Sequence, residues 1–223
     1  MKPCKHLWLV VLALGFPASG IFCQGAPAQD KGRPFQFEVS FSAAAHSQPI
    51  TGRVYAIVSK EGSREPRLQT GYDTPAGIPI WGKNVQALKP GEGAVVDETV
   101  FGFPLESINK ITPGEYYVQG FVNIYTEFKR SDGHTLWLHN DQWEGQRWNI
   151  SPGNLYSAPA KILIDPAKGE TIRLICDNVI PPVEIPPDTA YVKRIKFQSE
   201  ILTRFCFVWG GNGWAFCSTI RDH

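Results

Sequence analysis

Alternation of apolar and polar residues is the dominant pattern of this chain. In residues 35–41, FQFEVSF, the side chains of Phe35, Phe37, Val39 and Phe41 fall on one face of an extended strand, and polar side chains fall on the other. The same pattern, rich in β-branched and aromatic residues, recurs at 53–60, 115–128, 160–165, 170–177 and 191–202. Each of these stretches is therefore predicted to be a β-strand.

Turn signals of the Pro-Gly type separate the predicted strands, for example at Pro90, Pro113 and Pro152. No stretch beyond residue 28 sustains apolar residues at helical spacing for more than two turns, and parallel sheets need crossover connections that are usually helical. Tyr116 stands directly after a turn and at a strand start, as in many immunoglobulin-like sandwiches. The sequence therefore predicts an all-β fold, an antiparallel immunoglobulin-like β-sandwich with one long aromatic-rich loop.

The first 28 residues differ from the rest of the chain. Lys2 and Lys5 precede an apolar run at 7–16, and small residues follow at 18–20 and again at 26–28. The run is too short for a bilayer, which needs about 20 residues. Residues 1–28 are predicted to be a signal peptide, so the mature chain is expected to be secreted or periplasmic and free of the membrane.

Composition divides the remaining chain into a β-sandwich domain at 29–178, a proline-rich linker at 179–190, a strand region from 191 and an atypical tail at 206–223. Removal of the signal peptide leaves Cys176, Cys206 and Cys217. An odd set of three is a poor disulfide framework, and at most one bridge, between Cys206 and Cys217, is expected.

Charge and motifs narrow the function further. Lys and Arg number 22 against 21 Asp and Glu, so no basic excess indicates nucleic-acid binding. The glycine motifs of nucleotide binding are absent, and we expect no cofactor. The G-x-S-x-G motif of a hydrolase nucleophile is also absent, which argues against a catalytic serine within this chain.

Residues 131–157 concentrate histidines, carboxylates and tryptophans. The candidate metal ligands in this stretch are Asp132, His134, His139 and Asp141. The two histidines are five positions apart, so a strand would send them to opposite faces and only a bent loop would bring them together. A metal-dependent enzyme at 132–144 is therefore the weaker alternative to two tight turns flanking a short strand at 135–138.

Aromatic residues carry a stronger signal in the same region. Even positions of 115–128 form an apolar face, and odd positions mix aromatics with the amides Gln119 and Asn123. Aromatics with a few amides suit a carbohydrate or aryl ligand. The candidate contacts are Tyr117, Tyr125, Trp137, Trp143 and Trp148. Two interpretations remain open: a ligand platform in a free-standing binding module, or a second small core covered by the long loop.

Four segments together resemble the N-terminal region of bacterial secreted esterases, namely 49–62, 111–157, 179–189 and 191–205. In those proteins a β-sandwich precedes an α/β-hydrolase domain of the enterochelin-esterase-like kind. The resemblance covers about 35–205. It implies that 191–205 leads toward a hydrolase domain, which this chain lacks.

The resemblance implies a non-catalytic accessory domain whose partner is an α/β-hydrolase domain. From Cys206 onward the sequence departs from the family pattern. A truncated or shifted reading frame is one hypothesis for that change. A hydrolase frame in the downstream nucleotides would support it, and the absence of one in every frame would refute it.

Overall fold

The computed structural model describes residues 33–71, 77–130, 132–141, 146–184, 186–197 and 215–221. This part of the chain is all-β, with three short 3-10 turns at Pro66–Gln69, Ile108–Lys110 and Pro166–Lys168 as its helical structure. Its strands are β1 Gln36–Phe41, β2 Ile50–Ser59, β3 Ile80–Leu88, β4 Ala94–Val96, β5 Gly102–Phe103, β6 Gly114–Lys129, β7 Thr135–His139, β8 Leu155–Tyr156, β9 Ala160–Ile164, β10 Thr171–Cys176, β11 Asn178–Val179, β12 Val192–Phe197 and β13 Ala215–Arg221.

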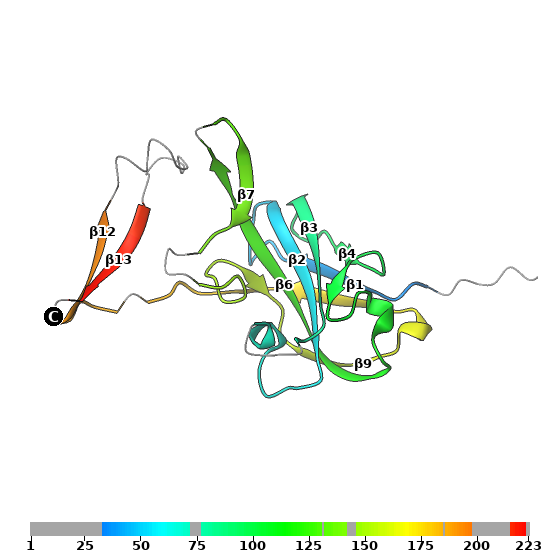
Figure 1. Cartoon of the computed structure of the whole chain (residues 1–223). Helices are drawn as coiled ribbons and strands as arrows, with labels where there is room; N and C mark the ends of the chain where they lie inside the picture. The colour runs from blue at the N-terminus through cyan, green and yellow to red at the C-terminus, as the bar shows by residue number, and fades with distance from the viewer. Residues whose placement is uncertain are drawn as a thin grey trace, which may run out of the picture. The chain divides into compact units, whose positions relative to one another are not determined.

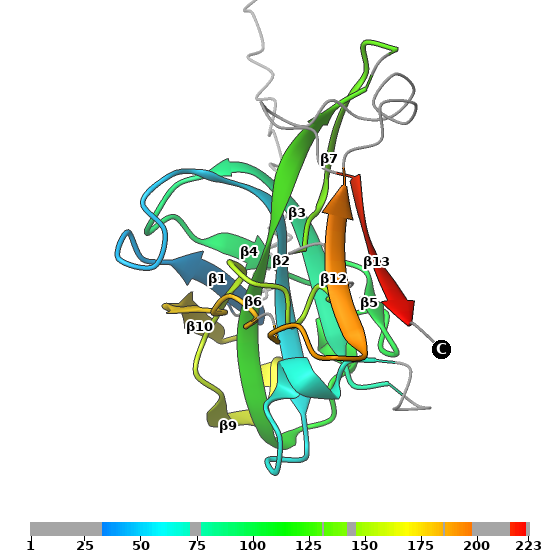
Figure 2. The same ribbon diagram turned by 90° about the vertical axis from the view of Figure 1, so that its left-hand side faces the viewer.

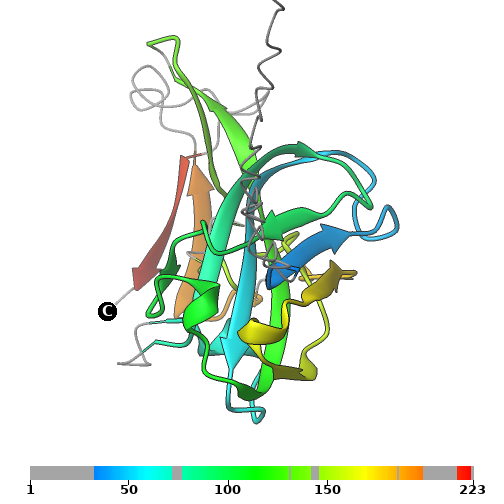
Figure 3. The same cartoon turned by 90° about the vertical axis from the view of Figure 1, so that its right-hand side faces the viewer.

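Two sheets form the main body (Figure 1). The smaller has the order β10-β1-β4, and the larger has the order β11-β8-β6-β2-β3-β5, with β7 and β9 also paired to β6. Figure 3 shows the smaller sheet, with β1 in blue and β10 in yellow, lying across the larger one. The long central strand β6 crosses the whole larger sheet, from β9 at one end to β7 at the other (Figure 2).

The main core lies between these two sheets because each contributes one apolar face. Phe37, Val39 and Phe41 of β1 are fully buried, as the alternation in 35–41 predicts. They share one hydrophobic cluster with Val54 of β2 and Val122 of β6. Burial of these side chains is the principal stabilising term of the fold.

One strand pair departs from the antiparallel prediction. Strands β1 and β10 are parallel, with Phe37 opposite Ile172 and Phe41 opposite Cys176. A parallel pair needs a long crossover, which is usually a helix. Here every strand of the larger sheet except β11 lies in the sequence between β1 and β10, so the crossover is made of strands and the purely antiparallel expectation is wrong.

Strand β3 was not predicted because its apolar residues do not alternate. Trp81, Val85 and Leu88 face the main core at spacings of four and three. The register against β2 shifts between Ile50 and Gly52, where β3 has an extra residue and Ala87 takes a left-handed φ of 50°. This bulge reverses the faces of the strand beyond it and so interrupts the period of two.

The first residues of the predicted linker at 179–190 belong to the folded body. Asn178 and Val179 form β11, and Ile180 donates its N–H to the Asn154 carbonyl and is buried. Downstream, β12 and β13 form an antiparallel hairpin, so part of the atypical tail pairs with the strand predicted from 191. Among the described residues, no helix is long and apolar enough to cross a membrane.

Some predictions concern residues that the structure does not describe. The signal peptide at 1–28, Trp143 and Cys206 lie outside the described residues. The expected Cys206–Cys217 disulfide therefore stays a prediction. Cys176 is a free, buried thiol, and burial raises its pKa far above the ordinary value.

Candidate functional site

The aromatic and amide face of β6 is covered in this structure. Gln119 and Phe121 are fully buried, and Asn123 is 3% exposed. Trp148 lies over Phe121 edge-on, with ring centroids 5.1 Å apart, and stacks on Tyr55 at 4.5 Å. These aromatic residues belong to a second hydrophobic cluster centred on Phe121. The described part of the long loop therefore helps to build a second small core.

The candidate platform residues are not brought together. Tyr117 and Tyr125 lie eight residues apart on β6, or about 26 Å along an extended strand. Tyr117 pairs with Lys161 of β9, and Tyr125 pairs with His139 of β7. Trp137 on β7 is 45% exposed, whereas Trp148 is packed in the second core. The described candidates do not form one continuous ligand platform.

The candidate metal ligands also separate. His134 lies 3.2 Å from Asp132 at the tip between β6 and β7, while His139 Nδ1 lies 2.9 Å from the Asn123 Oδ1. Asp132 also pairs with Arg130 at 2.8 Å. In the residues that the structure describes, no three histidine, cysteine or acidic side chains gather as a metal site.

The position of Asp132 is explained by a structural role in the turn before β7. Its Oδ1 accepts a hydrogen bond from the His134 backbone N–H at 3.1 Å. That bond is the main cause of a pKa below the usual carboxyl range, and the His134 side chain and Arg130 lower it further. An aspartate that caps the turn before a strand needs no metal.

A buried polar network on the same face was missed by the sequence reasoning. Gln119 Oε1 accepts from the Arg67 backbone N–H at 2.9 Å, and Gln119 Nε2 donates to Glu65 and to the Ser157 carbonyl. Arg67 donates to the Asn149 carbonyl at 2.8 Å, and its guanidinium carbon lies 4.2 Å from the Tyr156 ring centroid. The network joins the first 3-10 turn, β6 and the long loop.

Asn149 belongs to this network. Residues 149–151 match a glycosylation acceptor in sequence. Asn149 is 4% exposed, and its Nδ2 donates to the Arg67 carbonyl at 2.8 Å. The amide is therefore inaccessible to a glycan in the folded chain.

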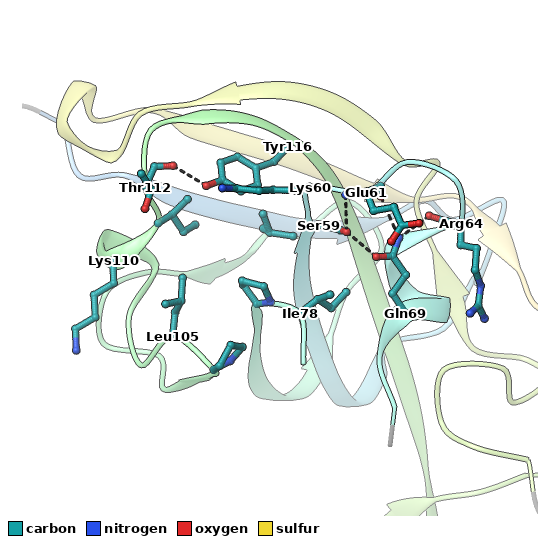
Figure 4. Close-up of a pocket in the computed structure, with 14 residues that line it drawn as sticks. Ser59, Lys60, Glu61, Arg64, Gln69, Ile78, Leu105, Lys110, Thr112 and Tyr116 are labelled. Atoms are coloured by element: carbon teal, nitrogen blue, oxygen red, sulfur yellow. Dashed lines mark hydrogen bonds between the residues drawn. The ribbon is translucent and has the colours of Figure 1, made fainter. Parts of the chain in front are cut away.

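A pocket of about 570 Å³ lies at the end of β2 and at the start of β6 (Figure 4). Its floor is apolar and includes Val58, Ile111 and Tyr116, all buried. Lys60 lies across the Tyr116 ring, with its Nζ 5.7 Å from the ring centroid. The sequence reasoning did not find this pocket, because its lining comes from strand ends, 3-10 turns and loops that share no motif.

No family model, curated protein or solved structure matches the chain.

The described residues offer little for nucleophilic catalysis. The three described histidines each contact another group: His46 contacts the Gln48 carbonyl, His134 contacts Asp132, and His139 contacts Asn123. None of them is bonded to a serine or a cysteine within the described part of the chain. The Cys176 thiol is buried, and burial raises its pKa. A nucleophile needs an adjacent base or a lowered pKa. Among the described residues, no histidine is placed to activate a serine or the Cys176 thiol.

Tyr55 gives a pH-dependent test of the second core. Burial, and secondarily the nearby Tyr125, raise the pKa of Tyr55 to about 12. Between pH 10 and 12 an unfolded tyrosine loses its proton more readily than folded Tyr55, so the free energy of unfolding should fall by about 2 kcal/mol over this interval. Denaturant titrations at pH 9, 10, 11 and 12 measure this fall.

Tyr55→Phe is the control, because it keeps the ring that stacks on Trp148 and cannot ionise. Its stability should fall less steeply above pH 10 than that of the unmodified chain. Parallel pH curves for the two proteins would contradict the burial of the Tyr55 hydroxyl.

Proposed function

We propose that the chain is a secreted, non-catalytic accessory β-sandwich of the immunoglobulin-like class that packs against an α/β-hydrolase domain. The resemblance of 35–205 to the N-terminal region of secreted esterases motivates the hydrolase partner. The signal-like sequence of 1–28 motivates export. The fold topology, one tyrosine and one projecting ribbon support the proposal.

The strand order supports an immunoglobulin-like topology. Strands β3, β2, β6 and β9 lie side by side in the order of strands C′, C, F and G, and β1 with β4 correspond to B and E. Strand β10 occupies the place of strand A beside β1, in a parallel direction. The strands equivalent to B, C, C′, E, F and G follow one another along the chain as in an immunoglobulin-like sandwich, whereas β10 follows all of them although strand A would come first.

Tyr116 supports the same assignment. It lies near the start of β6, the strand equivalent to F, and its hydroxyl donates to the Thr112 carbonyl at 2.7 Å. A tyrosine that bonds back to the turn before strand F is the tyrosine corner of immunoglobulin-like domains. The bond fixes the entry of the longest strand into the larger sheet.

Tyr116→Phe should lower the free energy of unfolding by about 1–1.5 kcal/mol, because it removes this hydrogen bond and keeps the buried ring. Urea denaturation measures the change. Tyr117→Phe is the matched control, since no hydrogen bond joins the half-buried Tyr117 hydroxyl to another described residue, and its effect should stay within about 0.5 kcal/mol. Equal effects of the two substitutions would contradict a tyrosine corner.

The observation that carries the accessory role is the ribbon of β6 and β7. Pairing of β2 with β6 ends at Ile124, and beyond it β6 pairs with β7 alone (Figure 1). Trp137 and Leu138 on β7 are each 45% exposed and point to opposite faces, because consecutive strand residues alternate. An exposed aromatic on a projecting ribbon is suited to anchor a protein partner.

An esterase assay tests the non-catalytic role. The purified chain should show no turnover of p-nitrophenyl acetate or butyrate above the buffer rate. Turnover that a serine-directed inhibitor abolishes would overturn the proposal.

A binding experiment tests the hydrolase partner. A purified hydrolase domain of the resembled family should bind the chain in calorimetry, and Trp137→Ala should weaken binding at least tenfold. Leu163→Ala is the matched control, because Leu163 is an exposed apolar residue on β9, which pairs at the opposite end of β6. Absence of binding, or equal loss in both variants, would contradict the proposed docking.

A further inference from the structure

The pocket of Figure 4 combines an apolar floor with cations at its rim. Val58, Ile111 and Tyr116 are buried at the floor, and the half-buried Ile78 and Leu105 form part of the wall. Its volume of about 570 Å³ is within the range of small-molecule sites, which are mostly apolar with a few polar groups that set orientation.

The polar groups deep in the wall already bond to one another. Ser59 Oγ donates to Gln69 Oε1 at 2.6 Å, and Gln69 Nε2 donates to backbone carbonyls of the same loop. The Tyr116 hydroxyl donates to the Thr112 carbonyl. A neutral sugar needs several hydrogen-bonding groups from its site, so this floor suits an apolar body better.

The charges at the rim favour an anion. Lys60, Arg64 and Lys110 line the pocket against the single carboxylate of Glu61. Lys110 pairs with Glu106, and Glu61 accepts a hydrogen bond from Ser63. Within the described residues, neither Lys60 nor Arg64 has a carboxylate at ion-pair distance; Arg64 donates to the Leu68 carbonyl.

The Lys60 ammonium is partly positioned before any ligand binds. Its stem crosses the Tyr116 ring, and the cation is attracted by the ring face at 5.7 Å. A charge held at the mouth of an apolar pocket can pair with an anionic group while the rest of the ligand occupies the floor. Inorganic phosphate would use only the rim, since it has no apolar body.

We propose that this pocket binds a small amphipathic carboxylate, with an aryl or short alkyl body on the floor and the carboxylate paired with Lys60. The proposal concerns this chain alone and does not depend on the hydrolase partner. Carboxylates of this class are released by ester hydrolysis, so a hydrolase beside the pocket would supply such ligands.

Isothermal titration calorimetry with the purified chain tests the site. trans-Cinnamate should bind saturably, and trans-cinnamamide, which has the same body without the charge, should bind at least tenfold more weakly. Hexanoate provides the alkyl body with the same charge, and the tighter of the two carboxylates identifies the body that fits. Inorganic phosphate should bind more weakly than either carboxylate.

Two variants locate the binding. Lys60→Met keeps the stem over Tyr116 and removes the charge, so it should weaken the tighter carboxylate about tenfold. Leu105→Trp should abolish binding by filling the pocket. Lys89→Met is the control, because Lys89 is exposed and lies outside the lining, and it should leave the affinity unchanged.

Failure of both carboxylates to bind would overturn the proposal. Equal affinity for cinnamate and cinnamamide, phosphate binding as tight as carboxylate binding, or an affinity that Lys60→Met does not change would also overturn it. Unfolding curves of each variant verify that it is folded under the titration conditions. None of these results depends on the esterase assay or on binding to a hydrolase domain.

Discussion

Replacing Trp81 with alanine is expected to lower the free energy of unfolding by about 3–5 kcal/mol. Trp81 is fully buried in the main core, and its ring stacks near Phe37 with centroids 6.3 Å apart. Its other side lies against Gly102 of β5, where an added Cβ would come within 2.2 Å of the indole. Alanine would therefore leave a large cavity between β3, β5 and the smaller sheet. Urea denaturation measures the loss.

Trp137→Ala is the matched control for this change. The same side chain is removed from the projecting ribbon, where it is 45% exposed, so the loss should stay below about 1 kcal/mol. Trp81→Phe should be milder than Trp81→Ala, because it keeps most of the ring and removes an indole N–H that has no acceptor among the described residues. Similar losses in Trp81→Ala and Trp137→Ala would contradict the burial of Trp81.

Strands with strict alternation were predictable from the sequence. The alternation at 35–41 and 170–177 matches β1 and β10, because one face of each strand is buried in the main core. The direction of β10 beside β1 was not predictable. Alternation fixes which face is buried, but it is the same for parallel and antiparallel partners.

The bulged strand β3 could not be found by periodicity for a local reason. The extra residue near Ala87 places Val85 and Leu88 on one face, although their separation is odd. A window that requires a period of two then reads the segment as irregular. Exposed polar residues in the middle of β3 weaken the signal further.

The amide face of β6 shows why composition alone could not separate a binding platform from a core. Phe121 and Trp148 have the residue types of either one, and the difference depends on what covers them. The cover comes through contacts between distant residues, such as Gln119 with Arg67, 52 positions apart. Such pairs leave no short-range pattern in a single sequence.

Replacing Gln119 with leucine should therefore test how the face is closed. The fully buried amide accepts from the Arg67 N–H and donates to Glu65 and to the Ser157 carbonyl. Leucine has a similar size but leaves these partners without their bonds in a site from which water is largely excluded. Unpaired buried polar groups cost about 1–3 kcal/mol each, and we expect a total loss of about 3 kcal/mol in unfolding free energy.

Hydrogen exchange gives this prediction a local signal, because the Arg67 amide bonds to the Gln119 side chain. In Gln119→Leu this amide should exchange much faster, while amides in the paired centre of β2 and β6 keep their protection. Gln86→Leu is the matched control, since Gln86 is exposed on β3 and should change stability by less than about 0.5 kcal/mol. An unchanged Arg67 amide would mean that the network does not hold the loop on the sheet. A faster one would show that the polar bonds around Gln119 hold the Arg67 turn on this face of the sheet.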